Sequence, residues 1–304
     1  MAPRNAAPRA PRTRAHDAVT SSTRAKRRAS QVGTLLQYWR DVRGMSQLAL
    51  AIEADVSPRH LSFVETGRAK PSREMVLHLA TALDVPLREQ NGLLLAAGYA
   101  PVFRESRLDA PELHTVRMAL DAILAKQEPY PAVVMNRTWD IVTSNAAATR
   151  FFGHLLGDAA VPSPPNVVRM MFDPAALRPF VSNWETVAES LVRRVHREAV
   201  GGVADEATAA LLADVLAYPG VPDRWSLSDP DAPLVPIIPV SFAKDGRAYT
   251  FFSAVTTLGT PQDVTLQELR IECFFPMNAE TELNIHALMS ATAAERADRD
   301  QSAT

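Results

Sequence analysis

Between residues 31 and 98, apolar residues recur at intervals of three and four, the spacing at which side chains share one face of an α-helix. The pattern falls into short runs, and serine, glycine or proline stands at most of the breaks, as expected at helix ends. It predicts five helices, which begin near Val32, Ser46, Ser57, Ser72 and Leu87. Helices this short are marginal alone, so we expect them to share one all-α core that ends at Gly98.

The second and third of these helices are separated by a tight break at Asp55-Val56. The third helix has an apolar side, with Leu61 and Val64, and an opposite stripe that comprises Arg59, Ser62, Phe63 and Thr66. A short helix, a tight turn and a second helix with an exposed Arg/Ser/aromatic edge are typical of a helix-turn-helix that binds DNA. Periodicity alone leaves one alternative open, a helical hairpin packed inside a larger all-α core.

After a linker at residues 99–110, helical and strand patterns are mixed. Helical spacing returns at Glu112–Lys126, after Asn145, and at Asn166–Phe172, Trp184–Ala199 and Ala207–Ala217. A strand followed by a turn is predicted at Tyr130–Arg137, and further strands at Trp139–Ser144, Ile237–Phe242, Arg247–Leu258 and Thr265–Phe275. We therefore expect an α+β domain with an antiparallel sheet at residues 111–290, interrupted by a Pro-rich connection at 219–239. Residues 291–304 are polar, and we expect a frayed tail.

The composition is that of an ordinary globular protein, since 47% of the 304 residues are hydrophobic and 22% are charged. The net charge of −2 conceals an uneven distribution, because residues 1–30 carry +7, residues 31–100 carry 0 and residues 101–304 carry −9. Positive charge beside a helix-turn-helix favours contact with nucleic acid. Residues 1–30 have almost no large apolar side chains, so we expect a disordered basic tail. Two interpretations of this tail remain open: a solvated segment, or an arm that binds phosphates through Arg24, Lys26, Arg27 and Arg28.

Several classes of protein are disfavoured by the sequence. Cys273 is the one cysteine, so an intrachain disulfide and a cysteine-based metal site are excluded, and the histidines show no metal-binding spacing. No apolar run approaches the roughly 18 residues of a membrane span, and no apolar segment follows the basic N-terminus, so we expect a cytoplasmic protein without a membrane partner. Catalytic and phosphate-binding motifs are missing, so we expect no enzyme activity, no metal and no cofactor. A charged cluster is most simply the solvated face of an amphipathic helix; it comprises Arg193, Arg194, His196, Arg197 and Glu198.

The block from residue 31 to residue 98 resembles the phage-repressor-like (XRE/Cro type) helix-turn-helix family, with the five-helix order intact. The resemblance implies that the third helix lies in the major groove of double-stranded DNA and that base edges are contacted by Arg59, Ser62 and Phe63. It also implies an ion pair between Arg40 and Glu65. Phosphate contacts are expected from Arg40, Gln47, Ser57, Thr66, Arg68 and Lys70. Pro58 departs from the family pattern, because relatives often have a polar, base-contacting residue there. Such modules usually bind as homodimers on two half-sites.

The second half, about 110–285, resembles the MmyB-like ligand-binding domain found behind such modules. The resemblance is carried by Asn136–Asp140, Asn145, Asn183–Glu185, Thr256–Gly259 and Leu269–Ile271. It implies a PAS-like fold with a pocket for a fatty-acid-like ligand. Candidate pocket residues are Trp139, Trp184 and Phe252, which suit a solid hydrophobic core equally well.

The sequence therefore predicts a multidomain protein, with an all-α five-helix helix-turn-helix domain followed by an α+β PAS-like domain. The predicted function is that of a sequence-specific DNA-binding transcription regulator whose second domain senses a small apolar ligand. The alternative is a regulator whose second domain is a ligand-free dimerisation scaffold.

Overall fold

The computed structural model describes residues 31–157, 159, 161, 163–200, 206–222, 225 and 237–302. The prediction for the basic tail, residues 1–30, lies outside them. The chain divides into two compact units, Met1–Phe103 and Arg104–Thr304, and the division falls inside the segment 99–110 that was expected to be a linker. Each unit has a hydrophobic core of its own.

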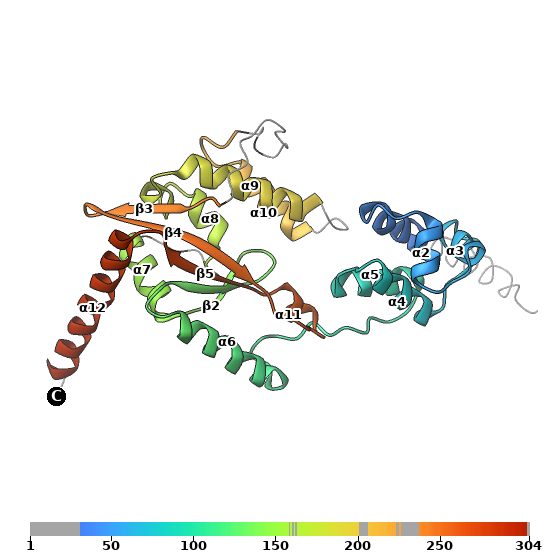
Figure 1. The fold of residues 1–304 in the computed structure, drawn as a ribbon, viewed down its shortest axis with the longest axis horizontal. Coiled ribbons are helices and arrows are strands. Elements are labelled where there is room, and N and C mark those ends of the chain that lie inside the picture. The colour runs from blue at the N-terminus through green and yellow to red at the C-terminus, as the bar shows by residue number, and fades with distance from the viewer. Residues whose placement is uncertain are drawn as a thin grey trace, which may run out of the picture. The chain divides into compact units, whose positions relative to one another are not determined.

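The first unit contains the five predicted helices, at residues 31–42 and at α2 (Gln47–Glu53), α3 (Pro58–Glu65), α4 (Arg73–Ala82) and α5 (Leu87–Ala97) (Figure 1). Three of them begin at a serine whose hydroxyl accepts a backbone N–H of the first turn, at 3.0–3.1 Å. These serines are Ser46, Ser57 and Ser72. The chain leaves α2 through Asp55, whose φ is +51°, and α5 through Gly98, whose φ is +85°.

The helix at residues 31–42 packs very closely on the end of α3. A Cβ atom added to Gly33 would lie 2.7 Å from the carbonyl oxygen of Val64 and closer still to that of Glu65. Only glycine fits this approach, so the first helix helps to set the position of the third.

The second unit is built on a five-stranded antiparallel sheet in the order β2-β1-β5-β4-β3. The strands are β1 (Ala132–Met135), β2 (Ile141–Ser144), β3 (Val240–Lys244), β4 (Arg247–Thr256) and β5 (Arg270–Pro276). The predicted α+β domain with an antiparallel sheet is confirmed.

Helices cover both faces of this sheet (Figure 1). On one face lie η1 (Pro111–Leu113), α6 (His114–Gln127) and α11 (Val264–Glu268), over a small apolar cluster. On the other, a larger core is formed with α7 (Ala146–Leu156), α8 (Val167–Phe172), η2 (Arg178–Phe180), α9 (Trp184–Val200), α10 (Glu206–Leu216) and α12 (Ala279–Ser302). Successive side chains of the central strand β5 therefore enter two different cores.

Three expectations for the last third of the chain need correction. The strand predicted at Thr265–Phe275 is a strand only from Arg270, because Asp263 caps the short helix α11 by accepting the N–H of Thr265 at 2.9 Å. The strand predicted at Ile237–Phe242 is shifted, since β3 runs on to a tight turn at Asp245-Gly246, where both φ values are positive. Helix α12 was not predicted, and its backbone continues to Ser302, through the segment expected to be frayed.

Candidate DNA-binding helix and candidate ligand cavity

Helix α3 presents the predicted base-reading stripe away from the core. Leu61 and Val64 are fully buried, whereas Arg59 is exposed and Ser62 and Phe63 are half-buried. The guanidinium carbon of Arg59 lies 5.5 Å from the centre of the Phe63 ring. This stacking places a charged guanidinium and an aromatic ring along one edge of the helix.

Four residues predicted to contact phosphate lie at the two ends of α3. Ser57 caps its start, and the hydroxyl of Thr66 donates to the carbonyl oxygen of Ser62 at 2.7 Å. Arg68 and Lys70 follow its end and are exposed, and the Lys70 ammonium lies 4.7 Å from the centre of the Tyr99 ring. The structure brings all four next to the stripe that was predicted to contact bases.

Arg40 and Gln47 are held by Glu65. The Arg40 Nε donates to one Glu65 carboxylate oxygen at 3.0 Å, and the Gln47 side-chain amide donates to the other at 2.9 Å. The Glu65 side chain is 1% exposed, so its carboxylate depends on these donors. The resulting cluster ties the first helix, α2 and α3 together, and it contains the expected Arg40–Glu65 ion pair.

The second unit contains a cavity of about 160 Å³ between the sheet and helices α8 and α9. Fourteen of its eighteen lining residues are apolar, among them Trp139, Phe152, Met170, Leu191 and Phe242. The other four are polar and come from one helix and two neighbouring strands: Ser190 and Arg194 from α9, Ser253 from β4 and Glu272 from β5. The cavity is therefore apolar with one polar region.

Glu272 is the acid of this polar region, and it belongs to the central strand of the sheet. Burial raises the pKa of its carboxyl above the usual value, and a hydrogen bond with Ser253 and the positive charge of Arg194 oppose this shift in part. Glu272 therefore takes up a proton at a higher pH than a surface glutamate does.

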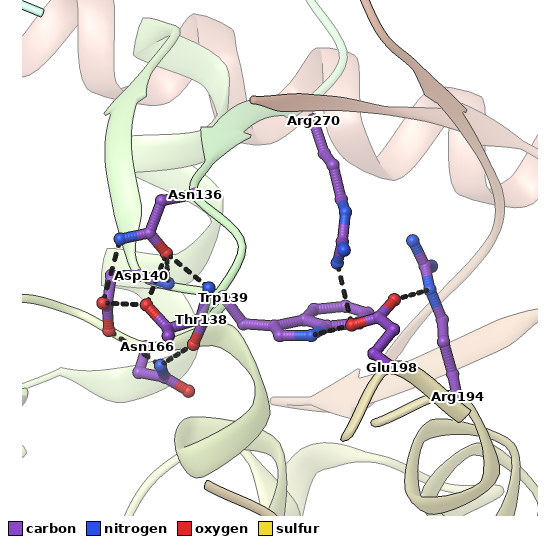
Figure 2. A network of polar contacts seen from close by, with 8 residues as sticks. All are labelled: Asn136, Thr138, Trp139, Asp140, Asn166, Arg194, Glu198 and Arg270. Atoms are coloured by element: carbon purple, nitrogen blue, oxygen red, sulfur yellow. Dashed lines mark hydrogen bonds and ion pairs between the residues drawn. The ribbon is translucent and has the colours of Figure 1, made fainter. Parts of the chain in front are cut away.

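Trp139 forms part of the cavity wall beside this region and is 1% exposed. Figure 2 shows its indole N–H donating to the Glu198 carboxylate, at 3.0 Å, while the Arg270 and Arg194 guanidinium groups bind the same carboxylate at 3.1 and 3.4 Å. The guanidinium carbons of Arg194 and Arg270 lie 4.5 and 5.4 Å from the centre of the indole ring. The ring is therefore held by one hydrogen bond and two cation–π contacts.

The backbone of Trp139 is strained, because its φ of +67° lies in the left-handed region, which bulky residues avoid. A second set of hydrogen bonds holds this turn (Figure 2). The Asn136 side-chain oxygen accepts the N–H groups of Thr138 and Asp140 at 3.0 and 2.9 Å. Asn166 donates to the Thr138 carbonyl and to the Asp140 carboxylate at 2.7 and 2.8 Å. The turn is thus over-determined, and it directs Trp139 into the cavity.

Comparisons with known families agree with this architecture. The model of the MmyB-like transcription regulator ligand-binding domain matches residues 116–288, more than half of the chain. The chain belongs to this family. A helix-turn-helix model matches residues 36–90 of the same chain. The protein is thus a DNA-binding transcription regulator with a ligand-binding domain.

Other comparisons add little to the description of this MmyB-like regulator. No curated protein matches the chain. One solved structure that it resembles is described as an RNA-binding Light-Oxygen-Voltage receptor, with 12% identity and a TM-score of 0.25 over 95% of this chain and 70% of that one. Similarity at this level supports no conclusion about fold or function.

The three predicted pocket residues of the MmyB-like regulator have separate locations, and Trp139 alone of them lines the cavity. Trp184 packs on Phe172 and Trp225, and its indole N–H donates to the Met171 carbonyl at 2.8 Å. Phe252 stacks on Phe275, with ring centres 5.1 Å apart, on the opposite face of the sheet. Trp184 and Phe252 are therefore better described as packing residues than as cavity residues.

Three functional candidates were missed by sequence reasoning. Arg194 and Glu198 were assigned to a solvated helix face. Arg194 lines the cavity, and Glu198 accepts a hydrogen bond from Trp139, which also lines it. Glu272 was not singled out, although a charged residue in a strand between Ile271 and Cys273 is a signal of a special site. Within the described residues, no cluster of His, Cys, Asp and Glu could hold a metal ion, and no helix is long and apolar enough to cross a membrane.

Proposed function

We propose that this MmyB-like regulator recognises a specific DNA sequence through Arg59, Ser62 and Phe63 of α3. We further propose that a fatty-acid-like ligand in the cavity of its second unit controls DNA binding. A ligand can change DNA affinity only if it binds the DNA-competent and DNA-incompetent states unequally. The protein would act as a homodimer, because one module of this size makes few contacts and two modules can occupy half-sites about one DNA turn apart.

The observation that carries the DNA part is the exposed stripe on α3, with Arg59 stacked on Phe63. An arginine can donate two hydrogen bonds to the O6 and N7 atoms of guanine, and this pair contributes roughly 1–3 kcal/mol of discrimination against other bases. Ser57, Thr66, Arg68 and Lys70 flank the stripe and suit phosphate contacts, which fix the register on DNA without reading its sequence. Arg40 and Gln47 belong to the same proposed phosphate-binding set.

Substituting Arg59 should reduce sequence preference. In Arg59→Ala, we expect the ratio of specific to non-specific affinity to fall by roughly 5- to 150-fold, the equivalent of one bidentate base contact. The matched control is Lys70→Ala, which should weaken binding to all DNA similarly and reduce the salt slope by about 1. Fluorescence anisotropy with operator and scrambled duplexes at several salt concentrations measures both quantities. An Arg59→Ala protein with unchanged preference would overturn the assignment of base readout.

The observation that carries the ligand part is the mainly apolar cavity behind Trp139. A cavity of about 150 Å³ lined by apolar residues can hold one benzene ring, so this one has room for a comparable apolar group. A longer acyl chain requires the surrounding side chains to move apart. The PAS-like description of this unit is supported by the β1–β2 hairpin, which leads directly into the Asn145-capped helix α7.

Filling the cavity should prevent ligand binding. Leu191→Trp places a larger side chain at the cavity wall, so we expect the affinity for octanoate to fall at least tenfold. The control is Leu283→Trp, because Leu283 is 70% exposed on α12 and does not line the cavity. Isothermal titration calorimetry measures the affinity, and native mass spectrometry followed by denaturing extraction detects any acyl ligand that copurifies. No binding of octanoate or other alkyl acids, together with no extractable ligand, would favour the ligand-free scaffold.

A further inference from the structure

The most unusual residue of the cavity is Glu272, an acid on the central strand of a sheet whose two faces are both covered. Alternate residues of β5 point to the same face, so Glu272 and Phe274 share the cavity side, whereas Ile271 and Cys273 belong to the core beneath α6. Glu272 is half-buried, and the desolvation of a carboxyl in such a place has a cost unless the group is paired or protonated. In a mostly apolar cavity, this cost is offset only if a partner or a proton is present at Glu272.

Few polar groups face Glu272. From β4 the Ser253 hydroxyl hydrogen-bonds to it, and from α9 the guanidinium of Arg194 supplies positive charge. Its neighbour on β1 is Val133, and its partner on β4 is Val255, so neither strand adds charge. Arg194 is also bound to Glu198, which in turn binds Arg270. The charged side chains near Glu272 are thus Arg194, Arg270 and Glu198, and Glu198 is bonded to both arginines.

We propose that the cavity binds the carboxylate of its ligand at this polar region, between Arg194 and the protonated carboxyl of Glu272, so that ligand binding takes up one proton. This inference rests on the proposed function, and it adds the chemistry of the head group and the residue that selects it. Glu272 is here a specificity-determining residue.

The charges lead to this arrangement. Ser190, Arg194, Ser253 and Glu272 are the only polar side chains among the described residues that line the cavity, so a carboxylate head can be satisfied only there. An ionised Glu272 would repel it, since two carboxylates that share a site cannot both ionise readily. A proton from solvent on Glu272 removes the repulsion, and the new O–H donates to a ligand oxygen. Arg194 balances the remaining negative charge of the ligand.

The sign of the pH dependence follows. Burial already raises the pKa of Glu272 in the free protein, and a bound carboxylate raises it further. Affinity is then highest below the pKa of the free protein and falls as pH rises, by up to tenfold per pH unit until the pKa of the complex is reached. At pH 6–8 an alkyl carboxylate is itself ionised, so its own titration does not contribute.

Calorimetry on the full chain tests the proposal with octanoate as the probe. Titrations at pH 6, 7 and 8, each in two buffers with different ionisation enthalpies, give the affinity and the number of protons taken up. For the unaltered protein we expect tighter binding at pH 6 than at pH 8 and net uptake that approaches one proton. For Glu272→Gln, which keeps a hydrogen-bond donor without a titratable proton, we expect binding with no uptake and no pH dependence.

Two further variants complete the design. Glu185→Gln changes an exposed glutamate of α9 outside the cavity and should behave like the unaltered protein. Arg194→Gln should lose at least tenfold in octanoate affinity while it retains 1-octanol binding, and this comparison remains informative should Glu272→Gln fail to fold.

The outcomes separate the two levels of the proposal. Octanoate binding without proton uptake, or tighter binding of octylamine than of octanoate, would overturn the role of Glu272. The proposal that the cavity binds an apolar ligand would stand. Absence of binding by octanoate, octylamine and octanol alike would overturn the ligand-binding function itself.

Discussion

Replacing Gly33 with alanine should destabilise the first unit strongly and weaken DNA binding with it. The added Cβ would lie 2.7 Å from the Val64 carbonyl oxygen and 2.8 Å from the Glu65 carbonyl carbon, so backbone must move rather than a flexible side chain. Overpacking of this kind costs about 1–3 kcal/mol. In a domain of this size, that loss lowers the melting temperature by roughly 4–24 °C. The displaced atoms belong to the end of α3, so we also expect weaker DNA binding.

The matched control is Gly92→Ala in helix α5. A Cβ at Gly92 meets nothing closer than a Glu89 side-chain oxygen at 3.9 Å, so alanine fits and should stabilise by up to about 1 kcal/mol. The two variants make the same chemical change in a helix, but we expect the first to lower the stability of the unit and the second to raise it. Thermal denaturation, followed by circular dichroism and by the loss of duplex binding, measures both. Equal melting temperatures for the two variants would show that the close approach of the first helix to α3 does not constrain the fold.

The first unit could be predicted almost completely from sequence because its signals are local. Each helix has its apolar stripe within one segment, and three of the five are capped by a serine directly before them: Ser46, Ser57 and Ser72 all form the expected bonds. Gly33 shows the limit of such signals. A glycine inside a helical pattern indicates a close approach, but its partner is more than 30 residues away, and one sequence does not identify it.

In the second unit one failure involves a residue that also makes a long-range contact. The run Thr265–Phe275 is apolar enough for one long strand, but Asp263 caps a helix there and also accepts the N–H of Ser106 at 3.1 Å, far away in sequence. By contrast, the hairpin at Asp245-Gly246 carried a strong local signal that could have been used.

The candidate cavity was only partly predictable for a related reason. Alternation in β5 places Arg270 and Glu272 on one face, and from sequence this face is expected to be in water. Helix α9 covers it, so the same residues line or border a cavity, together with Arg194 and Glu198. The polar side chains of β5 and those of α9 thus meet at the same cavity. The sequence of either element alone does not predict this pairing. Trp139 was found from family resemblance, and its positive φ was not foreseen.

Replacing Asn145 should have the largest effect in the second unit, because its side chain satisfies buried backbone groups of three segments. Its oxygen accepts the N–H of Ala148 at 2.8 Å, as the cap of α7, and the N–H of Ala132 in β1 at 3.0 Å. Its amide donates to the carbonyl oxygen of Tyr130 at 2.8 Å. In Asn145→Ala the cap is lost, at about 1 kcal/mol, and two buried backbone groups remain unpaired, at about 1–3 kcal/mol each. We expect a total loss of roughly 3–7 kcal/mol.

Asn278→Ala provides the comparison that isolates the buried bonds. Asn278 also caps a helix, since its oxygen accepts the N–H of Thr281 at 2.8 Å, but it is exposed. We expect it to cost about 1 kcal/mol, the value of a cap alone. Urea denaturation of variants that also carry Trp39→Phe, so that the fluorescence comes from Trp139, Trp184 and Trp225, gives both free energies if the slope with urea is unchanged. Because Asn145 joins the end of the β1–β2 hairpin to α7, and Trp139 lies in the turn of that hairpin, Asn145→Ala should also weaken octanoate binding. Similar losses of stability in the two variants would mean that Asn145 acts only as a helix cap and does not set the position of the cavity wall.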